Sequence, residues 1–190
     1  TMCEAHHNNL LAELGIKILS DISNIRMICI AGPSSSGKTT FANRLRVELM
    51  SRGLSPIRIS IDDYYLEKKY IPKDENGQPD LECIEALNID QFNQDMLDLI
   101  NGEEVTLPHF DFKIGKQVPG KTLKLGKNEI LIIEGIHALN DRLTSLVARH
   151  QKYKIFIAPQ AQVNIDNHNP ISLTDLRLLR RIVRDYKFRG

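Results

Sequence analysis

The segment Gly32–Thr39, which reads Gly-Pro-Ser-Ser-Ser-Gly-Lys-Thr, constrains the fold more than any other part of this 190-residue chain. It has the spacing of a phosphate-binding P-loop, and such a loop requires a strand before it and a helix after it. The run Arg26–Ala31 is apolar enough for a strand that is buried on both faces. The segment Thr39–Met50 has helical periodicity. The loop therefore has the context that an α/β fold gives it.

The residue types of this loop suit the binding of phosphate groups. Gly32 and Gly37 allow backbone conformations that turn successive N–H groups toward phosphate oxygens, and the next helix adds its N-terminal dipole. Lys38 is expected to reach the β- and γ-phosphates, and the Thr39 hydroxyl to bind Mg²⁺. The sequence therefore predicts a site for ATP with Mg²⁺. The predicted cofactor-binding residues of this loop are Gly32, Pro33, Ser34, Ser35, Ser36, Gly37, Lys38, Thr39 and Thr40.

Further strands and helices alternate along the chain. Strands are predicted at Ser55–Ile61, Glu129–Ile133 and Lys154–Ala158, and helices at Leu10–Ile22, Asn88–Asn101 and Thr174–Lys187. Lys68–Leu81 is predicted to be a loop, and Glu103–Lys127 an irregular hairpin or insert. This alternation predicts a mainly parallel central sheet covered by helices, the three-layer α/β sandwich of P-loop NTPases. Ligands of such sheets bind beyond the carboxyl ends of the strands.

The composition is that of an ordinary globular domain. Lys and Arg number 25 against 24 Asp and Glu, and this balance argues against nucleic acid as the main partner. No apolar stretch approaches the roughly 20 residues that span a bilayer, and the N-terminus has no signal pattern. Three scattered cysteines indicate neither a disulfide framework nor a zinc site. A cytoplasmic protein that binds neither membrane nor nucleic acid is expected, and homo-oligomerisation stays open.

Two acidic residues follow predicted strands at the P-loop edge. Asp62 could accept the proton of an attacking hydroxyl group or hold Mg²⁺ through water, and the alternative is that it caps the next turn. We assign the functional role to Asp62 and the capping role to Asp63. Glu134 could orient Mg²⁺ and its waters, and the alternative is an edge residue in contact with water.

The predicted C-terminal helix has arginines at helical spacing. Such a run is typical of a solvated surface, but phosphoryl transfer also needs cations that neutralise the transferred group. Arg181, Arg184 and Arg189 are the candidates for phosphate contacts. A second open question concerns the aromatic residues, which suit either stacking on a base or sugar, or core packing. These aromatic residues are Tyr64, Tyr65, Phe110 and Phe112.

Two known classes of nucleotide-dependent protein lack support in the sequence. There is no Asn-Lys-x-Asp segment that would read guanine, and there is no His-Arg-Asp catalytic loop of protein kinases. Five other segments occur in a recognisable order. They are residues 32–40, 59–65 (Ile-Ser-Ile-Asp-Asp-Tyr-Tyr), 107–112 (Leu-Pro-His-Phe-Asp-Phe), 132–137 (Ile-Ile-Glu-Gly-Ile-His) and 174–190.

Together these segments resemble the uridine kinase and phosphoribulokinase family of P-loop kinases. The resemblance implies transfer of the γ-phosphoryl group of ATP to a small-molecule hydroxyl, with the 5′-hydroxyl of a nucleoside as the first candidate. It implies a general base at Asp62 and a lid over ATP that contains Arg181, Arg184 and Arg189. The implied catalytic residues are Asp62, Lys38, Arg181 and Arg184; the implied metal ligands are Thr39, Asp62 and Glu134; the implied substrate contacts are Asp80, Phe110, Phe112 and Arg177.

The sequence departs from this family pattern after Phe112. Pyrimidine nucleoside kinases have a base-reading His there, whereas this chain has Lys-Ile-Gly-Lys at 113–116. Two alternatives therefore remain open: a different small hydroxyl substrate, such as a sugar phosphate or a pantothenate-like acid, or an ATP-binding regulatory module without catalysis. The resemblance also suggests that residues 1–24 are the tail of a preceding region, and that residues 25–190 are a kinase domain truncated at its lid.

Overall fold

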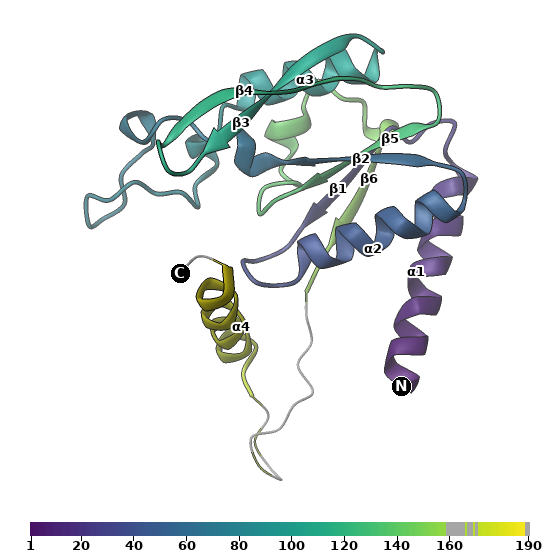
Figure 1. Ribbon diagram of the computed structural model, residues 1–190, viewed down its shortest axis with the longest axis horizontal. Coiled ribbons are helices and arrows are strands. Elements are labelled where there is room, and N and C mark those ends of the chain that lie inside the picture. Colours follow the sequence, from purple (N-terminus) through teal and green to yellow (C-terminus); the bar gives the residue numbers. More distant parts are fainter. Residues whose placement is uncertain (159–165, 167–168, 170, 189–190) are drawn as a thin grey trace.

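The computed structural model describes residues 1–158, 166, 169 and 171–188. Its centre is a sheet of four parallel strands (Figure 1). In spatial order these strands are β2 (Ser55–Ser60), β5 (Glu129–Glu134), β1 (Met27–Ala31) and β6 (Lys152–Phe156). Helices cover both faces, so the predicted α/β sandwich with a parallel sheet is confirmed.

The two inner strands explain why the sheet lies in the core. Every residue of β1 is buried, and β5 is buried from its second residue onward. Their side chains alternate between the two faces, as the pleat requires. Met27 and Cys29 therefore join one apolar cluster, whereas Ile28 and Ile30 join the other. Burial raises the pKa of the Cys29 thiol to about 12, which keeps this residue a neutral core side chain.

One face of the sheet is covered by α1 (Met2–Ser20) and α2 (Lys38–Ser51). Leu11 and Ile18 of α1 pack in the same cluster as Leu45 and Leu49 of α2. The leading helix was predicted correctly, but its predicted start was wrong by eight residues. Thr1 and Glu4 form a capping box, and the spacing of these two residues is the local signal for a helix that begins at Met2.

The opposite face is covered by α3 (Ile89–Ile100) and by a separate two-stranded sheet. The Asn88 side chain caps α3 by accepting a hydrogen bond from the N–H of Gln91. The two strands β3 (Glu104–Asp111) and β4 (Lys116–Lys124) are antiparallel and form the predicted hairpin. Val105 and Leu107 anchor this hairpin in the core formed with α3.

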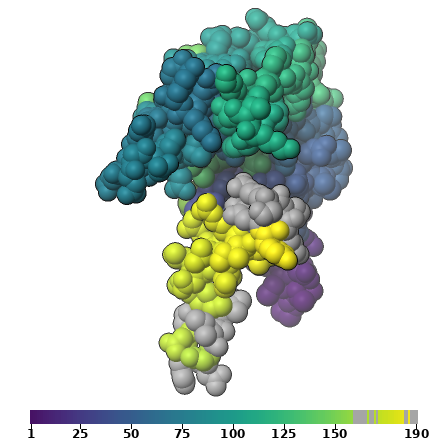
Figure 2. All heavy atoms as spheres, turned by 60° about the vertical axis from the view of Figure 1, so that its left-hand side comes forward, coloured from purple at the N-terminus to yellow at the C-terminus, as the bar shows by residue number. Residues whose placement is uncertain are grey.

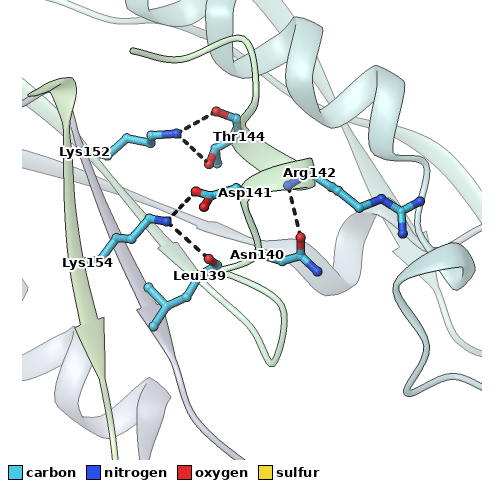
Figure 3. Close-up of polar contacts among 7 residues, drawn as sticks. All are labelled: Leu139, Asn140, Asp141, Arg142, Thr144, Lys152 and Lys154. Carbon is cyan, nitrogen blue, oxygen red and sulfur yellow. Dashed lines mark hydrogen bonds and ion pairs between the residues drawn. The ribbon is translucent and has the colours of Figure 1, made fainter. Parts of the chain in front are cut away.

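Two lysines of β6 attach the segment after β5 to the sheet (Figure 3). The Lys152 amine donates to the carbonyl oxygen and the hydroxyl of Thr144, at 2.8 and 3.1 Å, and Lys154 pairs with Asp141. Burial, and then the charge of Lys154, lower the pKa of Lys152. β6 begins at Lys152, two residues before its predicted start. Lysines are tolerated on this strand because Thr144 and Asp141 pair with their amines.

The remaining helix, α4 (Leu173–Phe188), stands apart from the layers at the carboxyl edge of the sheet (Figure 1). Figure 2 shows it (yellow) below the body of the molecule, on the side where the hairpin β3–β4 (teal to green) faces the viewer. Within the described residues, no helix has the combination of length and apolar character that crossing a bilayer requires.

Candidate active site

The carboxyl ends of the strands open into a cavity of about 560 Å³. The P-loop forms one wall, and the ends of β2 and β5 form another. The cavity brings together most of the predicted P-loop residues with Asp62, Glu134 and Arg181. Its lining residues are Ser34, Ser35, Gly37, Lys38, Thr39, Thr40, Ser60, Asp62, Tyr65, Leu81, Glu82, Glu134, Gly135, Ile136, Arg180 and Arg181.

The P-loop backbone has the geometry of an anion-binding turn. Gly37 and Ser35 have positive φ angles, 98° and 57°, and such left-handed residues direct neighbouring N–H groups into one concave surface. Gly32 allows the close approach of a neighbouring segment, because a Cβ atom at this position would lie 2.4 Å from the carbonyl oxygen of Ile157. The special backbone conformation predicted for both glycines is therefore found at Gly37, whereas Gly32 is needed for close packing instead. Gly32, Pro33 and Ser36 support the loop without lining the cavity.

The polar side chains of the loop suit an anionic ligand. The Lys38 amine donates to the carbonyl oxygens of Gly32 and Pro33, at 2.8 and 3.0 Å, so it lies folded over the loop. The hydroxyl oxygens of Ser35 and Ser36 are buried without a hydrogen-bond partner among the described residues. Buried polar atoms are normally paired, and Ser35 also lines the cavity, so an anionic ligand there is a candidate partner for the Ser35 hydroxyl.

Glu134 supplies the acidic wall of the cavity. It is the last residue of β5, only 8% exposed, and its two carboxylate oxygens accept from the Thr39 hydroxyl at 3.1 and 2.9 Å. Arg58 lies 4.0 Å from the same carboxylate. A carboxylate buried this deeply requires such partners. The alternative of a solvated edge residue is therefore wrong.

Thr39, Asp62 and Glu134 bring oxygen atoms to one cavity, so the chemistry of these side chains suits Mg²⁺. Mg²⁺ prefers oxygen ligands, and it is usually held by one or two carboxylates together with substrate phosphates. In the described part of the chain, no group of three or more His, Cys, Asp or Glu side chains could hold a metal ion by itself. The chemistry of the side chains present thus agrees with a metal that binds together with the nucleotide.

Asp62 and Asp63 lie in a short 3₁₀ helix, Ile61–Tyr64, which we call the aspartate turn. The Ser60 hydroxyl caps this turn by accepting from the Asp62 N–H, so the capping role predicted for Asp63 is wrong. Asp62 lines the cavity with the P-loop, as predicted. Asp63 instead accepts hydrogen bonds from His109 Nδ1 and from the N–H of Phe110, at 2.8 and 3.3 Å.

Three aromatic rings form a cluster beside the cavity. Tyr65 contacts Phe110 and Phe112 edge-on, with ring centroids 5.8 and 6.3 Å apart, and the two phenylalanines are 5.0 Å apart. Phe110 is buried, whereas Phe112 is 63% exposed. Tyr64 is fully buried against Phe92, and Phe110 is 4% exposed, so core packing is correct for these two residues, whereas the Phe112 ring remains accessible.

Tyr65 also carries a hydroxyl group that stays neutral. It donates to the carbonyl oxygen of Leu81 at 2.9 Å. Burial, and then the carboxylates of Asp62 and Glu82, raise the pKa of Tyr65 to about 12. Asp80 accepts from the N–H of Glu82, so it shapes the segment that lines the cavity without lining it itself.

Two arginines of α4 contact the P-loop backbone. Arg177 Nε donates to the carbonyl oxygen of Ser34 at 3.0 Å, and Arg180 Nε donates to that of Ser35 at 3.1 Å. Arg177 therefore lies on the phosphate side of the site. Arg180 lines the cavity beside Arg181 and was missing from the predicted set, although its three-residue spacing from Arg177 places both on one helix face. The side chain of Arg184 and all of Arg189 lie outside the described residues.

Comparison with known proteins decides which family this site belongs to. Residues 27–190 match the model of the Phosphoribulokinase / Uridine kinase family. The chain belongs to this family. A uridine kinase of Staphylococcus haemolyticus (strain JCSC1435) is 30% identical over 169 residues, covering 89% of this chain and 72% of the relative. A uridine kinase of Staphylococcus aureus (strain JH9) is 30% identical over 164 residues, covering 86% and 70%.

Solved structures support the same fold. A possible uridine kinase from Bacillus stearothermophilus superposes with a TM-score of 0.60 at 19% identity, covering 95% of this chain and 91% of that one. A candidate fructose transport system kinase from Silicibacter sp. TM1040 gives 0.61 at 20% identity, covering 93% and 82%. Family membership makes this chain a small-molecule kinase, a phosphotransferase with a hydroxyl group as acceptor.

Proposed function

We propose that this chain transfers the γ-phosphoryl group of ATP to the 5′-hydroxyl of a nucleoside. The observation that carries the proposal is the shared cavity, which places the Asp62 carboxylate among the P-loop residues and beside Tyr65. A base, a phosphate-binding loop and an aromatic surface are the three parts that such a transfer needs. ATP, Mg²⁺ and a small hydroxyl substrate are the proposed ligands.

The P-loop holds the phosphates of ATP. Its N–H groups surround the phosphate oxygens, and the hydroxyl group of Ser35, which lines the cavity, gains a phosphate oxygen as its partner. The Lys38 amine exchanges the carbonyl oxygens of Gly32 and Pro33 for the β- and γ-phosphates. Each of these contacts positions the γ-phosphorus for in-line attack.

Asp62 acts as the general base. The acceptor hydroxyl gives its proton to the Asp62 carboxylate while its oxygen attacks the γ-phosphorus, and the bond from that phosphorus to the β-phosphate oxygen breaks to release ADP. The Ser60 cap fixes the backbone of this residue at the end of β2. Thr39, Asp62 and Glu134 would hold Mg²⁺, which neutralises charge on the phosphate oxygens when it is bound.

The arginines of α4 supply positive charge to the cavity beside the P-loop. Arg180 and Arg181 line the cavity facing the P-loop. Guanidinium groups at this place stabilise the charge on the transferred phosphoryl group. Arg184 lies further along the same helix, Arg189 follows later in the sequence, and both remain candidates for the same role.

The aromatic cluster is proposed to bind the nucleoside. The exposed ring of Phe112 offers a face for stacking, and the rings of Phe110 and Tyr65 hold it through edge-to-face contacts. The absence of a His in residues 113–116 favours a second candidate, a small hydroxyl substrate other than a pyrimidine nucleoside. This departure concerns only recognition of the acceptor and leaves the phosphate chemistry unchanged.

A panel of acceptors tests the proposal. ADP release from the full chain is measured with ATP and Mg²⁺ in the presence of pyrimidine and purine nucleosides, sugars, sugar phosphates and pantothenate-like acids. A nucleoside that raises ADP release, and whose 5′-phosphate appears by mass spectrometry, supports the proposal. Stimulation by a sugar or an acid alone supports the second candidate. Tight ATP binding without stimulation by any acceptor contradicts both and favours a regulatory module.

A further inference from the structure

The aspartate turn sends its two carboxylates to different places. Asp62 lines the phosphate cavity, whereas Asp63 lines a separate cavity of about 360 Å³ together with Arg58, His109 and Lys121. A 3₁₀ helix has three residues per turn, so consecutive side chains necessarily point in different directions. The proposed chemistry uses Asp62 and gives no role to Asp63.

Asp63 holds two groups of β3 at once. Its Oδ1 atom accepts from His109 Nδ1 at 2.8 Å and from the N–H of Phe110 at 3.3 Å. A carboxylate only accepts hydrogen bonds, so His109 carries its hydrogen on Nδ1. The Asp63 side chain is 31% exposed, and bonds to an ionised acceptor are stronger than those between neutral groups.

The hairpin needs a tether at this point of β3. Within the described structure its two strands pair only with each other, and two-stranded hairpins are marginally stable by themselves. Pro108 faces Pro119 across the hairpin, next to an irregularity in register. This irregularity interrupts the regular pairing between the core-anchored end of the hairpin and the end that carries Phe110.

We propose that Asp63 is a positioning residue that fixes the aromatic acceptor surface relative to the Asp62 carboxylate. The bond to the Phe110 N–H holds the residue whose ring contacts both Tyr65 and Phe112. Asp62 and Asp63 are adjacent in one short turn. The hydrogen bonds from β3 to Asp63 therefore hold the hairpin in place relative to the Asp62 carboxylate. His109 orients the Asp63 carboxylate from the neighbouring position on β3. The catalytic consequence rests on the proposed function, whereas the tether does not.

Amide hydrogen exchange tests the tether without any substrate. Asp63→Ala removes the acceptor, so exchange of the Phe110 N–H is expected to become about tenfold faster or more. Asp63→Asn keeps an amide oxygen that accepts the same bond, so it restores most of the protection. Thr106→Val is the matched control, because it removes the Thr106–Thr122 side-chain bond of the same hairpin without touching the turn. Unchanged Phe110 exchange in Asp63→Ala would overturn the proposal.

Kinetics then test the consequence for phosphoryl transfer. With an acceptor that the wild type phosphorylates, Asp63→Ala is expected to lower kcat/KM for that acceptor about 10- to 100-fold, while KM for ATP stays unchanged. Asp63→Asn is expected to restore most of the lost kcat/KM. In the double variant Asp63→Ala, His109→Ala, kcat/KM should fall by less than the product of the two single effects, because the two residues act as one unit. An equal rise in both KM values would overturn the positioning role.

The two experiments separate failure of this inference from failure of the proposed function. If the wild type phosphorylates no acceptor, the proposed function fails, and the exchange data alone decide whether Asp63 tethers β3. If the wild type is active and Asp63→Ala retains full acceptor kcat/KM, the positioning role is wrong and the proposed function stands. Thermal melting of each variant identifies losses that come from unfolding.

Discussion

The phosphate end and the acceptor end of the site are built in different ways. The phosphate end belongs to the central sheet, because the P-loop follows β1, Glu134 ends β5, and Thr39 joins the two through a side-chain hydrogen bond. The proposed acceptor end comes from a hairpin that, among the described residues, shares no strand pairing with that sheet. It reaches the site through ring contacts and through the Asp63 carboxylate.

The two ends therefore differ in how easily their residues can change. Groups at the ends of buried parallel strands are fixed by the whole core, so their positions are costly to alter. A hairpin that packs on one face can change its tip, such as residues 113–116, without disturbing the sheet. We therefore expect substitutions at the phosphate end to affect turnover with any acceptor, and substitutions at the acceptor end to affect only particular acceptors.

The largest expected effect is that of Asp62→Asn. The amide cannot accept the proton of the acceptor hydroxyl, so kcat should fall about 1,000-fold while ATP binding survives. Steady-state ADP release and ATP titration measure the two quantities. Glu82→Gln is the matched control, because it neutralises another carboxylate of the same cavity. Full activity of Asp62→Asn, or loss of its ATP binding, would contradict the assigned role.

Glu134→Gln should have the next largest effect. The amide oxygen can still accept from the Thr39 hydroxyl, so the fold is expected to persist, but the loss of charge weakens the proposed Mg²⁺ site. Turnover should fall about 10- to 100-fold, with a higher Mg²⁺ concentration required for half-maximal rate. A Mg²⁺ titration of ADP release, together with thermal melting, measures both. An unchanged dependence of the rate on Mg²⁺ concentration would show that Glu134 does not hold the metal ion.

Phe112→Ala should affect the acceptor alone. The ring is 63% exposed, so stability should change little, whereas KM for a nucleoside should rise up to about tenfold through loss of stacking. Ile114→Ala is a suitable control, because it shortens an apolar side chain of similar exposure in the same hairpin. A rise in KM for ATP that matches the rise for the acceptor would break the distinction between the two ends.

Arg180→Ala should have the smallest effect of the set. It removes a hydrogen bond to the Ser35 carbonyl and one positive charge from the cavity, so KM for ATP should rise about threefold to tenfold. KM for the acceptor should stay constant. Arg46→Ala, an exposed arginine of α2, provides the control for loss of charge alone. A larger rise in KM for the acceptor than in KM for ATP would contradict the assignment of α4 to the phosphate end of the site.

The sequence predicted the phosphate end better than the acceptor end for a physical reason. The P-loop is contiguous, and Asp62 and Glu134 each follow an apolar strand, so local patterns suffice to place them on one edge. The Asp63–His109 bond joins residues 46 positions apart, and no local pattern announces it. The capping role assigned to Asp63 was wrong because the turn is already capped by Ser60, whose hydroxyl accepts the hydrogen bond from the Asp62 N–H.

The arginines show the same limit in a helix. Their spacing predicted a shared face, but which of them meets the P-loop depends on how α4 docks, and Arg177 and Arg180 occupy that position. The start of α1 was missed for a different reason, since the capping box of Thr1 and Glu4 lies ahead of the apolar periodicity. Caps are local signals and could have been used.

The most direct test of the central claim follows the γ-phosphoryl group itself. The full chain is incubated with Mg²⁺ and ATP labelled at the γ-phosphorus, with and without a nucleoside, and the label is then divided between nucleoside 5′-phosphate and inorganic phosphate. The account predicts label in the nucleoside product for the wild type and its loss in Asp62→Asn. Label found only in inorganic phosphate, at the same rate with and without every acceptor, would contradict it.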